Sequence, residues 1–175
     1  MKIRHVRWLC ALCVMACLSV SFCSCKPLRP LPDYRDRGFS ATVRWESEGV
    51  TICAELETVV EEGDLAGLCR VTLSSPSSLA GAVLEKSEQG VAMTLEGVCI
   101  ESPGADKIWK ACALLTSDGE MDDVCDTEWQ GLSVRYSEIG EGEDRCSLFR
   151  ERKTGAPMRI EKGELVLVVE RFLHT

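Results

Sequence analysis

From residue 38 onward, apolar and polar side chains alternate along the chain. One run covers residues 39–46 and a second covers residues 50–57, with a Ser-Glu-Gly turn at residues 47–49 between them. Alternation with a period of two is typical of β-strands that bury one face, and two such runs around a short turn predict a hairpin. A third run, at residues 69–74, predicts the next strand.

The same alternation predicts further strands, which glycine-containing turns separate. They cover residues 82–86, 91–100, 132–136, the segment between the turns at 140–142 and 154–157, and 165–172. Leu132, Val134 and Tyr136 are the apolar positions of one of these strands. The last strand is apolar on both faces at residues 166–169, which predicts a central or covered position. Residues 117–129 are acidic and show no regular period, so they are expected to form an irregular connection.

Residues 105–116 carry apolar side chains at helical spacing and follow a Ser-Pro-Gly start signal at residues 102–104. A shorter helical turn is predicted at residues 75–81, with Ser75 as its cap and Pro76 at its first position. The predicted fold class is therefore α+β: a curved antiparallel sheet of roughly eight to nine strands with one main helix on one face. A single domain is expected from the length of 175 residues.

The first 25 residues have the features of an export signal. Lys2, Arg4 and Arg7 precede a run without charges from residue 8 to residue 22, which is 15 residues long. That length suits a signal peptide better than a bilayer-spanning helix, which needs about 20 residues. The uncharged stretch can be extended to Cys25, and at that length an uncleaved transmembrane anchor is the alternative interpretation.

The segment Phe22-Cys23-Ser24-Cys25 resembles a bacterial lipobox, in which an apolar residue and two small residues precede a lipid-modified cysteine. Cys25 is the predicted lipidation site, because bulky Phe22 would stand directly before Cys23. An ordinary signal peptide with chance cysteines is the alternative interpretation. Two acyl chains would hold the protein firmly, at about 0.8 kcal/mol per buried methylene group. The expected location is the extracytoplasmic face of the cell membrane.

Residues 26–37, KPLRPLPDYRDR, contain Pro27, Pro30 and Pro32 and few apolar side chains. Such a segment favours extended geometry and is expected to act as a semi-rigid tether. The predicted organisation is thus a signal peptide at 1–25, a tether at 26–37 and a β-rich domain at 38–175.

The charge balance argues against a nucleic-acid partner. The whole chain has a net charge of −8, and without its first 25 residues the balance is 17 − 28 = −11. A nucleic-acid-binding surface needs a surplus of cationic side chains, and the sequence shows no cluster of Lys and Arg that could form a local patch. Anionic lipid headgroups are expected to repel a domain this acidic for the same reason.

No constellation of residues in the domain predicts catalysis, a cofactor or a metal. The two histidines are His5, in the signal segment, and His174, which excludes catalytic and zinc sites that need an interior histidine. The acidic pairs Glu61-Glu62 and Asp122-Asp123 lie in turn-like segments and are expected to be solvated. Calcium ligation by the acidic residues at 120–126 would lack the EF-hand spacing.

Six cysteines follow Cys25, and export permits them to form disulfides. Their number is even, but the sequence does not choose among the 15 possible pairings. Free or partly paired structural thiols and a disulfide framework therefore both remain open. The residues are Cys53, Cys69, Cys99, Cys112, Cys125 and Cys146.

The order of these segments resembles that of small Gram-positive lipoproteins with a LolA-like domain, which are related in shape to carriers of outer-membrane lipoproteins. Ser75, Pro76, Leu79 and Gly81 match a recurrent SPxxLxG element, and an apolar strand ends the domain. The resemblance implies an open half-barrel whose helix lies across the concave side over an apolar cavity. The carriers, however, are soluble shuttles, and their cavity arginine has no match here. The cavity lining expected from the resemblance is Val43, Trp45, Val71, Leu73, Met93, Leu95 and Trp109.

Two functional hypotheses follow. The first is an anchored lipoprotein that binds a lipid or another hydrophobic ligand, for which the concave side must not be fully packed. The second is a surface or envelope protein-interaction module without a ligand, for which a filled core and an exposed patch are expected. Trp45 and Trp109 lie on apolar faces and are expected to be core residues rather than ligand platforms. Met93 and Leu95 can either line a cavity or belong to a plain core. The oligomeric state stays open.

Overall fold

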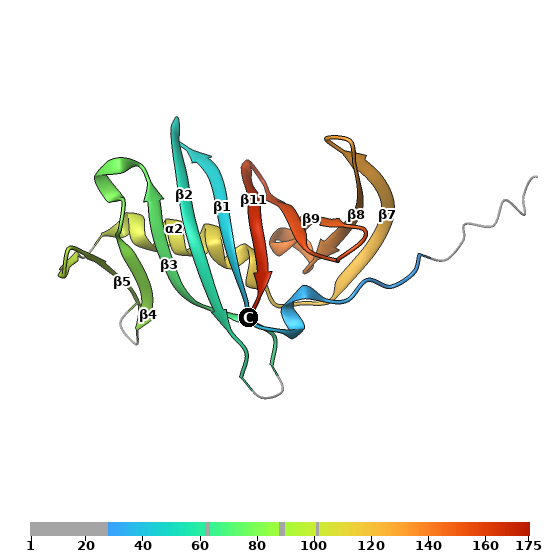
Figure 1. The fold of residues 1–175 in the computed structure, drawn as a ribbon, viewed down its shortest axis with the longest axis horizontal. Helices are drawn as coiled ribbons and strands as arrows, with labels where there is room; N and C mark the ends of the chain where they lie inside the picture. Colours follow the sequence, from blue (N-terminus) through green and yellow to red (C-terminus); the bar gives the residue numbers. More distant parts are fainter. Residues whose placement is uncertain (1–27, 62–63, 88–89, 101) are drawn as a thin grey trace, which may run out of the picture.

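The computed structural model describes residues 28–61, 64–87, 90–100 and 102–175. The predicted signal peptide, Cys25 and the first two residues of the predicted tether lie outside these residues. Eleven strands form one antiparallel sheet in the order β6-β5-β4-β3-β2-β1-β11-β10-β9-β8-β7 (Figure 1). The strands are β1 (Phe39–Ser47), β2 (Val50–Val59), β3 (Gly67–Ser75), β4 (Val83–Ser87), β5 (Gly90–Leu95), β6 (Val98–Ile100), β7 (Met121–Trp129), β8 (Leu132–Ile139), β9 (Cys146–Glu151), β10 (Pro157–Lys162) and β11 (Leu165–His174).

The sheet is open, because β6 and β7 form its two edges and do not pair with each other. The predicted hairpin at residues 39–57 is confirmed as β1 and β2, and the third predicted strand is confirmed as β3. β11 pairs with β1 on one side and with β10 on the other, so the last strand is central, as its two apolar faces predict.

Two predictions about strands are wrong. The segment 91–100 is not one strand but the hairpin of β5 and β6, because Glu96 and Gly97 form a turn with φ values of 50° and 81°. Positive φ at both central residues is the geometry of a two-residue hairpin turn. The expected irregular connection at 117–129 instead contains β7, so the sheet has eleven strands and not eight to nine.

The predicted main helix is confirmed as α2 (Pro103–Ala113), which continues into the 3₁₀ turn η3 (Leu114–Thr116). The Ser102 hydroxyl accepts a hydrogen bond from the Gly104 N–H and caps the helix. α2 crosses one face of the sheet and packs against β3, β5 and β11 (Figure 1). We call this face of the sheet the helix face. None of the helices in the described part of the chain is long and apolar enough to cross a bilayer.

The predicted turn at 75–81 forms as the 3₁₀ turn η2 (Ser77–Leu79), but Ser75 does not cap it. β3 extends through Ser75, and the Ser75 hydroxyl donates to the Thr51 carbonyl of the neighbouring strand β2. The turn begins after Pro76 without a side-chain cap. A hydroxyl directed at a paired strand cannot also bond the N–H groups of the next turn.

Candidate functional site

The helix face has two chemically different halves. The first, which we call the apolar half, lies between α2 and strands β1 to β5. Each of the expected cavity-lining residues except Leu95 is at most 8% exposed, and Leu95 is half-buried against them. The structure brings this set together in one apolar layer: Val43, Trp45, Val71, Leu73, Met93, Leu95 and Trp109.

The margin of this layer lies at the β5–β6 edge of the sheet. Leu95 and Val91 of β5, Ile100 of β6 and Ile108 of α2 are half-buried and pack against the core cluster. α2 contacts β5 directly, while β6, with only three residues, ends the sheet here. The apolar half is therefore least covered where the helix passes the short edge strand.

Trp45 also borders a separate pocket of about 220 Å³ at the far end of β1. Arg44, Glu46 and Glu164 line this pocket together with Val166 and Val168. Half of its lining residues are charged, so it does not continue the apolar layer.

The six cysteines in the described residues all have free thiols, and no disulfide links them. Cys112 of α2 is fully buried in the apolar half, and burial raises its pKa to about 12. Cys146 is also buried, and its thiol donates to the Asp144 carbonyl. These two behave as small core residues, whereas Cys69, Cys99 and Cys125 are exposed.

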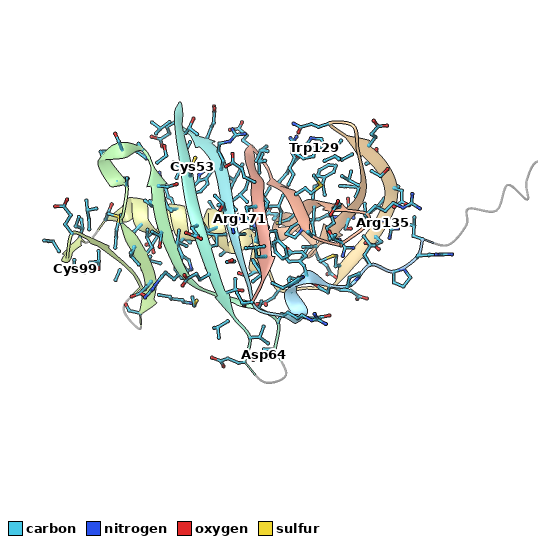
Figure 2. All side chains as sticks on the ribbon, in the orientation of Figure 1. Cys53, Asp64, Cys99, Trp129, Arg135 and Arg171 are labelled. Carbon is cyan, nitrogen blue, oxygen red and sulfur yellow. The ribbon has the colours of Figure 1, made fainter. Side chains whose placement is uncertain are left out.

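The second half of the helix face carries buried arginines, and we call it the arginine half. Arg35, Arg135 and Arg150 are each at most 2% exposed. Arg135 of β8 and Arg150 of β9 lie opposite each other in the sheet. Figure 2 shows Arg135 beside β7 and β8, on the side of the sheet where the amino-terminal segment passes.

Asp123 of β7 is the shared acceptor of this cluster. One carboxylate oxygen accepts from Arg150 and from the Ser137 hydroxyl, the latter at 2.8 Å, and the other accepts from Arg135 at 2.6 Å. Burial raises the pKa of Asp123, but the hydrogen bonds and the two guanidinium charges outweigh burial and hold the pKa below its usual value. Asp126 pairs with Arg135 as well, and with Arg152 at 3.1 Å.

These arginines hold the amino-terminal segment against the sheet. Arg135 donates to the carbonyl of Arg29 at 3.0 Å, and Arg150 donates to the carbonyl of Pro32 at 3.1 Å. Arg35 belongs to the 3₁₀ turn η1 (Tyr34–Asp36) and donates to the carbonyls of Ser117 and Gly119.

The segment is also fixed by a buried hydroxyl and by close backbone packing. Tyr34 is 2% exposed, and its hydroxyl donates to the Leu115 carbonyl at 2.9 Å. A Cβ at Gly155 would lie 3.0 Å from the Pro32 carbonyl oxygen, so a side chain there has almost no space. Much of the predicted 26–37 tether is therefore packed on the domain.

The alternation of apolar and polar residues did not predict the arginine half. In β8 it predicted an apolar face formed by Leu132, Val134 and Tyr136. The core face of β8 instead carries Arg135 and Ser137, in line with Ile139. Val134 is buried on the opposite face of the sheet. The inward position of Arg135 could have been inferred from Ile139, because every second residue of a strand faces the same side. A charged side chain at such a position predicts exposure, so the inference is not made from hydropathy alone.

No protein-family model matches the sequence, and no curated protein matches it. Among solved structures, an uncharacterized conserved protein from Thermus thermophilus has a TM-score of 0.50 at 17% identity, over 82% of this chain and 81% of that chain. The MucA/MucB complex of Pseudomonas aeruginosa gives 0.44 at 15% identity, over 81% of this chain and 53% of that chain. A domain provisionally described as an outer membrane lipoprotein-sorting protein, from Vibrio parahaemolyticus, gives 0.37 at 9% identity, over 79% of this chain and 86% of that chain.

At these identities the likeness to the Thermus protein shows the fold alone. The chain spans about half the length of the MucB-complex chain that it matches. The two lower scores are too weak to support an inference about this chain.

Proposed function

We propose that the chain is an exported lipoprotein, anchored through Cys25 on the extracytoplasmic face of the cell membrane, whose domain binds a lipid or another hydrophobic ligand. Its role is binding and not catalysis. The observation that carries the proposal is the apolar layer between α2 and an open sheet. This is the architecture that the resemblance to LolA-like lipoproteins implies.

The place for the ligand is between α2 and strands β3 and β5. Met93 and Leu73 of the sheet and Trp109 of the helix are its expected first contacts. Entry is expected beside Leu95 and Ile108, where the layer is only half-buried. A hydrophobic ligand that enters between the helix and the sheet would replace the contacts between their side chains by contacts with the ligand. The apolar side chains of both elements would then stay buried away from water.

Native mass spectrometry tests the ligand on a chain that begins at Lys26, purified from cells. An extra mass that disappears on organic extraction and returns with membrane lipids is the expected result. Leu95→Asp places a charge at the proposed entry and should abolish the extra mass. Leu173→Asp, which changes a leucine that is 47% exposed near the end of β11 and outside the apolar half, is the matched control and should retain it.

The anchor needs its own test. Intact-mass analysis of the full-length protein from membranes should find the signal peptide removed and a lipid mass on Cys25. Cys25→Ala should abolish lipid labelling and release the protein from the membrane fraction. A mature chain without lipid would contradict the anchoring proposal, whatever the ligand experiment shows.

The second candidate function is an envelope protein-interaction module without a ligand. One observation favours it: most of the expected cavity-lining residues are at most 8% exposed, so side chains fill the layer everywhere except at its half-buried margin beside Leu95 and Ile108. An unchanged mass after incubation with membrane lipids would favour this second function over the first.

A further inference from the structure

The amino-terminal segment leaves the folded domain very close to the proposed lipid anchor. Its backbone is already held at Arg29 and Pro32 by the buried arginines of the sheet. Leu28 follows Cys25 by only three residues, which span at most about 11 Å when fully extended. A lipid on Cys25 would thus bring the surface around Leu28 to the bilayer.

Two neighbouring hollows mark this surface, and they share Arg152. One, of about 460 Å³, is lined by residues 28–31 together with Asp126, Arg135 and Arg152. The other, of about 390 Å³, is lined by Leu132, Ser133, Glu151, Arg152 and Lys153. Arg29, Arg152 and Lys153 are exposed around them, and Leu132 is 47% exposed. We call these four residues the exit patch.

The exit patch differs in charge from the rest of the domain. Of the acidic residues that line its two hollows, Asp126 pairs with Arg135 and Arg152, and Glu151 accepts a hydrogen bond from the Thr154 hydroxyl. Asp126 balances the charge of Arg152, so Arg29 and Lys153 supply the excess positive charge of the patch in a chain that carries −11 after residue 25. The sequence does not predict this patch, because the two residues lie far apart in the chain and only the fold brings them to one surface. Anionic headgroups would attract this surface and repel the remainder.

We propose that the exit patch docks on the anionic phospholipid surface of the membrane that holds Cys25. This inference rests on the proposed anchoring and adds an orientation to it. Arg29, Arg152 and Lys153 contact headgroup phosphates, and Leu132 reaches toward the acyl boundary. The clamped segment makes the docking rigid, because Arg135 and Arg150 leave little free chain between the lipid and the sheet.

The test uses the lipidated full protein in nanodiscs and follows backbone hydrogen exchange at residues 131–133 and 152–155. On discs with phosphatidylglycerol, exchange there should be slowed several-fold relative to pure phosphatidylcholine discs, and high salt should remove the difference. The double variant Arg29→Glu/Lys153→Glu should abolish this protection from exchange. It leaves the buried arginine cluster intact, because neither of these two side chains takes part in the cluster.

The matched control is Lys110→Glu/Arg171→Glu, which changes the net charge equally on α2 and β11, away from the exit patch. Figure 2 places Arg171 on the central part of the sheet, far from Arg135. The control should keep the protection. Equal exchange on both kinds of disc, or loss in the control as well, would overturn the docking surface. A lipid mass on Cys25 in the same sample shows that anchoring itself stands, and its absence would overturn both.

Discussion

The two halves of the helix face cover the same sheet by opposite means. In the apolar half, α2 is held by packing of aliphatic and aromatic side chains, which is not directional and tolerates displacement. In the arginine half, Arg135 and Arg150 hold the amino-terminal segment by hydrogen bonds to fixed carbonyls, which require one geometry. The difference indicates that α2 can move away from the sheet to admit a ligand, whereas the amino-terminal segment stays in place.

The largest effect is expected from the arginine half. Asp123→Ala leaves Arg135 and Arg150 buried without their shared carboxylate, and breaking a buried ion pair typically costs about 3–5 kcal/mol. Urea denaturation should show a loss of that order in the free energy of unfolding. Asp122→Ala, at the exposed neighbouring position, should change it by less than about 0.5 kcal/mol. Equal effects of the two substitutions would show that the cluster is not a stabilising unit.

The apolar half should respond through cavity formation. Leu73 of β3 is 1% exposed, and Leu73→Ala should lower the free energy of unfolding by about 3 kcal/mol, within the usual range of about 2–5. Leu73→Met conserves volume and should cost less than about 1.5 kcal/mol. A hydrophobic ligand that fills the space left by Leu73→Ala should stabilise that variant more than it stabilises the unmodified protein, and it should stabilise Asp123→Ala and the unmodified protein equally.

Tyr34 tests how firmly the segment is fixed. Tyr34→Phe keeps the ring among its aromatic neighbours Phe39 and Phe172 but removes the hydrogen bond to the buried Leu115 carbonyl. The expected loss is about 1–2 kcal/mol, because a buried acceptor is left without its partner. Protease cleavage near residue 34 should become faster, and an unchanged cleavage rate would contradict a fixed segment.

Acid should weaken the arginine half selectively. The pKa values of Asp33 and Asp123 lie below the usual 3.8 in the folded protein, so their contribution to stability is fully present above that value. It is lost as the pH falls below about 4 and through the folded pKa values. Between pH 5 and pH 3, the urea midpoint of the unmodified protein should fall more steeply than that of Asp123→Asn. If the urea midpoints of the two proteins fell equally with pH, Asp123 would not be the source of the acid sensitivity.

The apolar half could largely be predicted from the sequence, and the arginine half could not. Strand alternation assigned Val43 and Leu73 to the apolar faces of their strands, because apolar side chains at a period of two indicate burial directly. The family resemblance placed them in one layer. Arg35 and Asp123 carry no such signal, since their charges predict exposure. Their partners, among them Ser117 and Arg150, lie far away in the chain, and only the folded topology brings these groups together.

The same limit explains the error at residues 117–129. Asp123 and Asp126 occupy inward positions of β7, where apolar residues are expected in a half-buried strand. Their carboxylates are stabilised there by Arg135 and Arg150. A pattern based on hydropathy predicts a solvated loop for such a strand.

Photocrosslinking with a diazirine-labelled fatty acid tests the central claim most directly, because it reports where a hydrophobic ligand lies. In the chain that begins at Lys26, without membranes, peptide mass spectrometry should find adducts on α2 and on strands β3 and β5, around Met93 and Trp109, and none on β7 to β9. Excess unlabelled membrane lipid should compete them away. Adducts spread evenly over the chain, or adducts confined to the arginine half, would contradict a ligand site between the helix and the sheet.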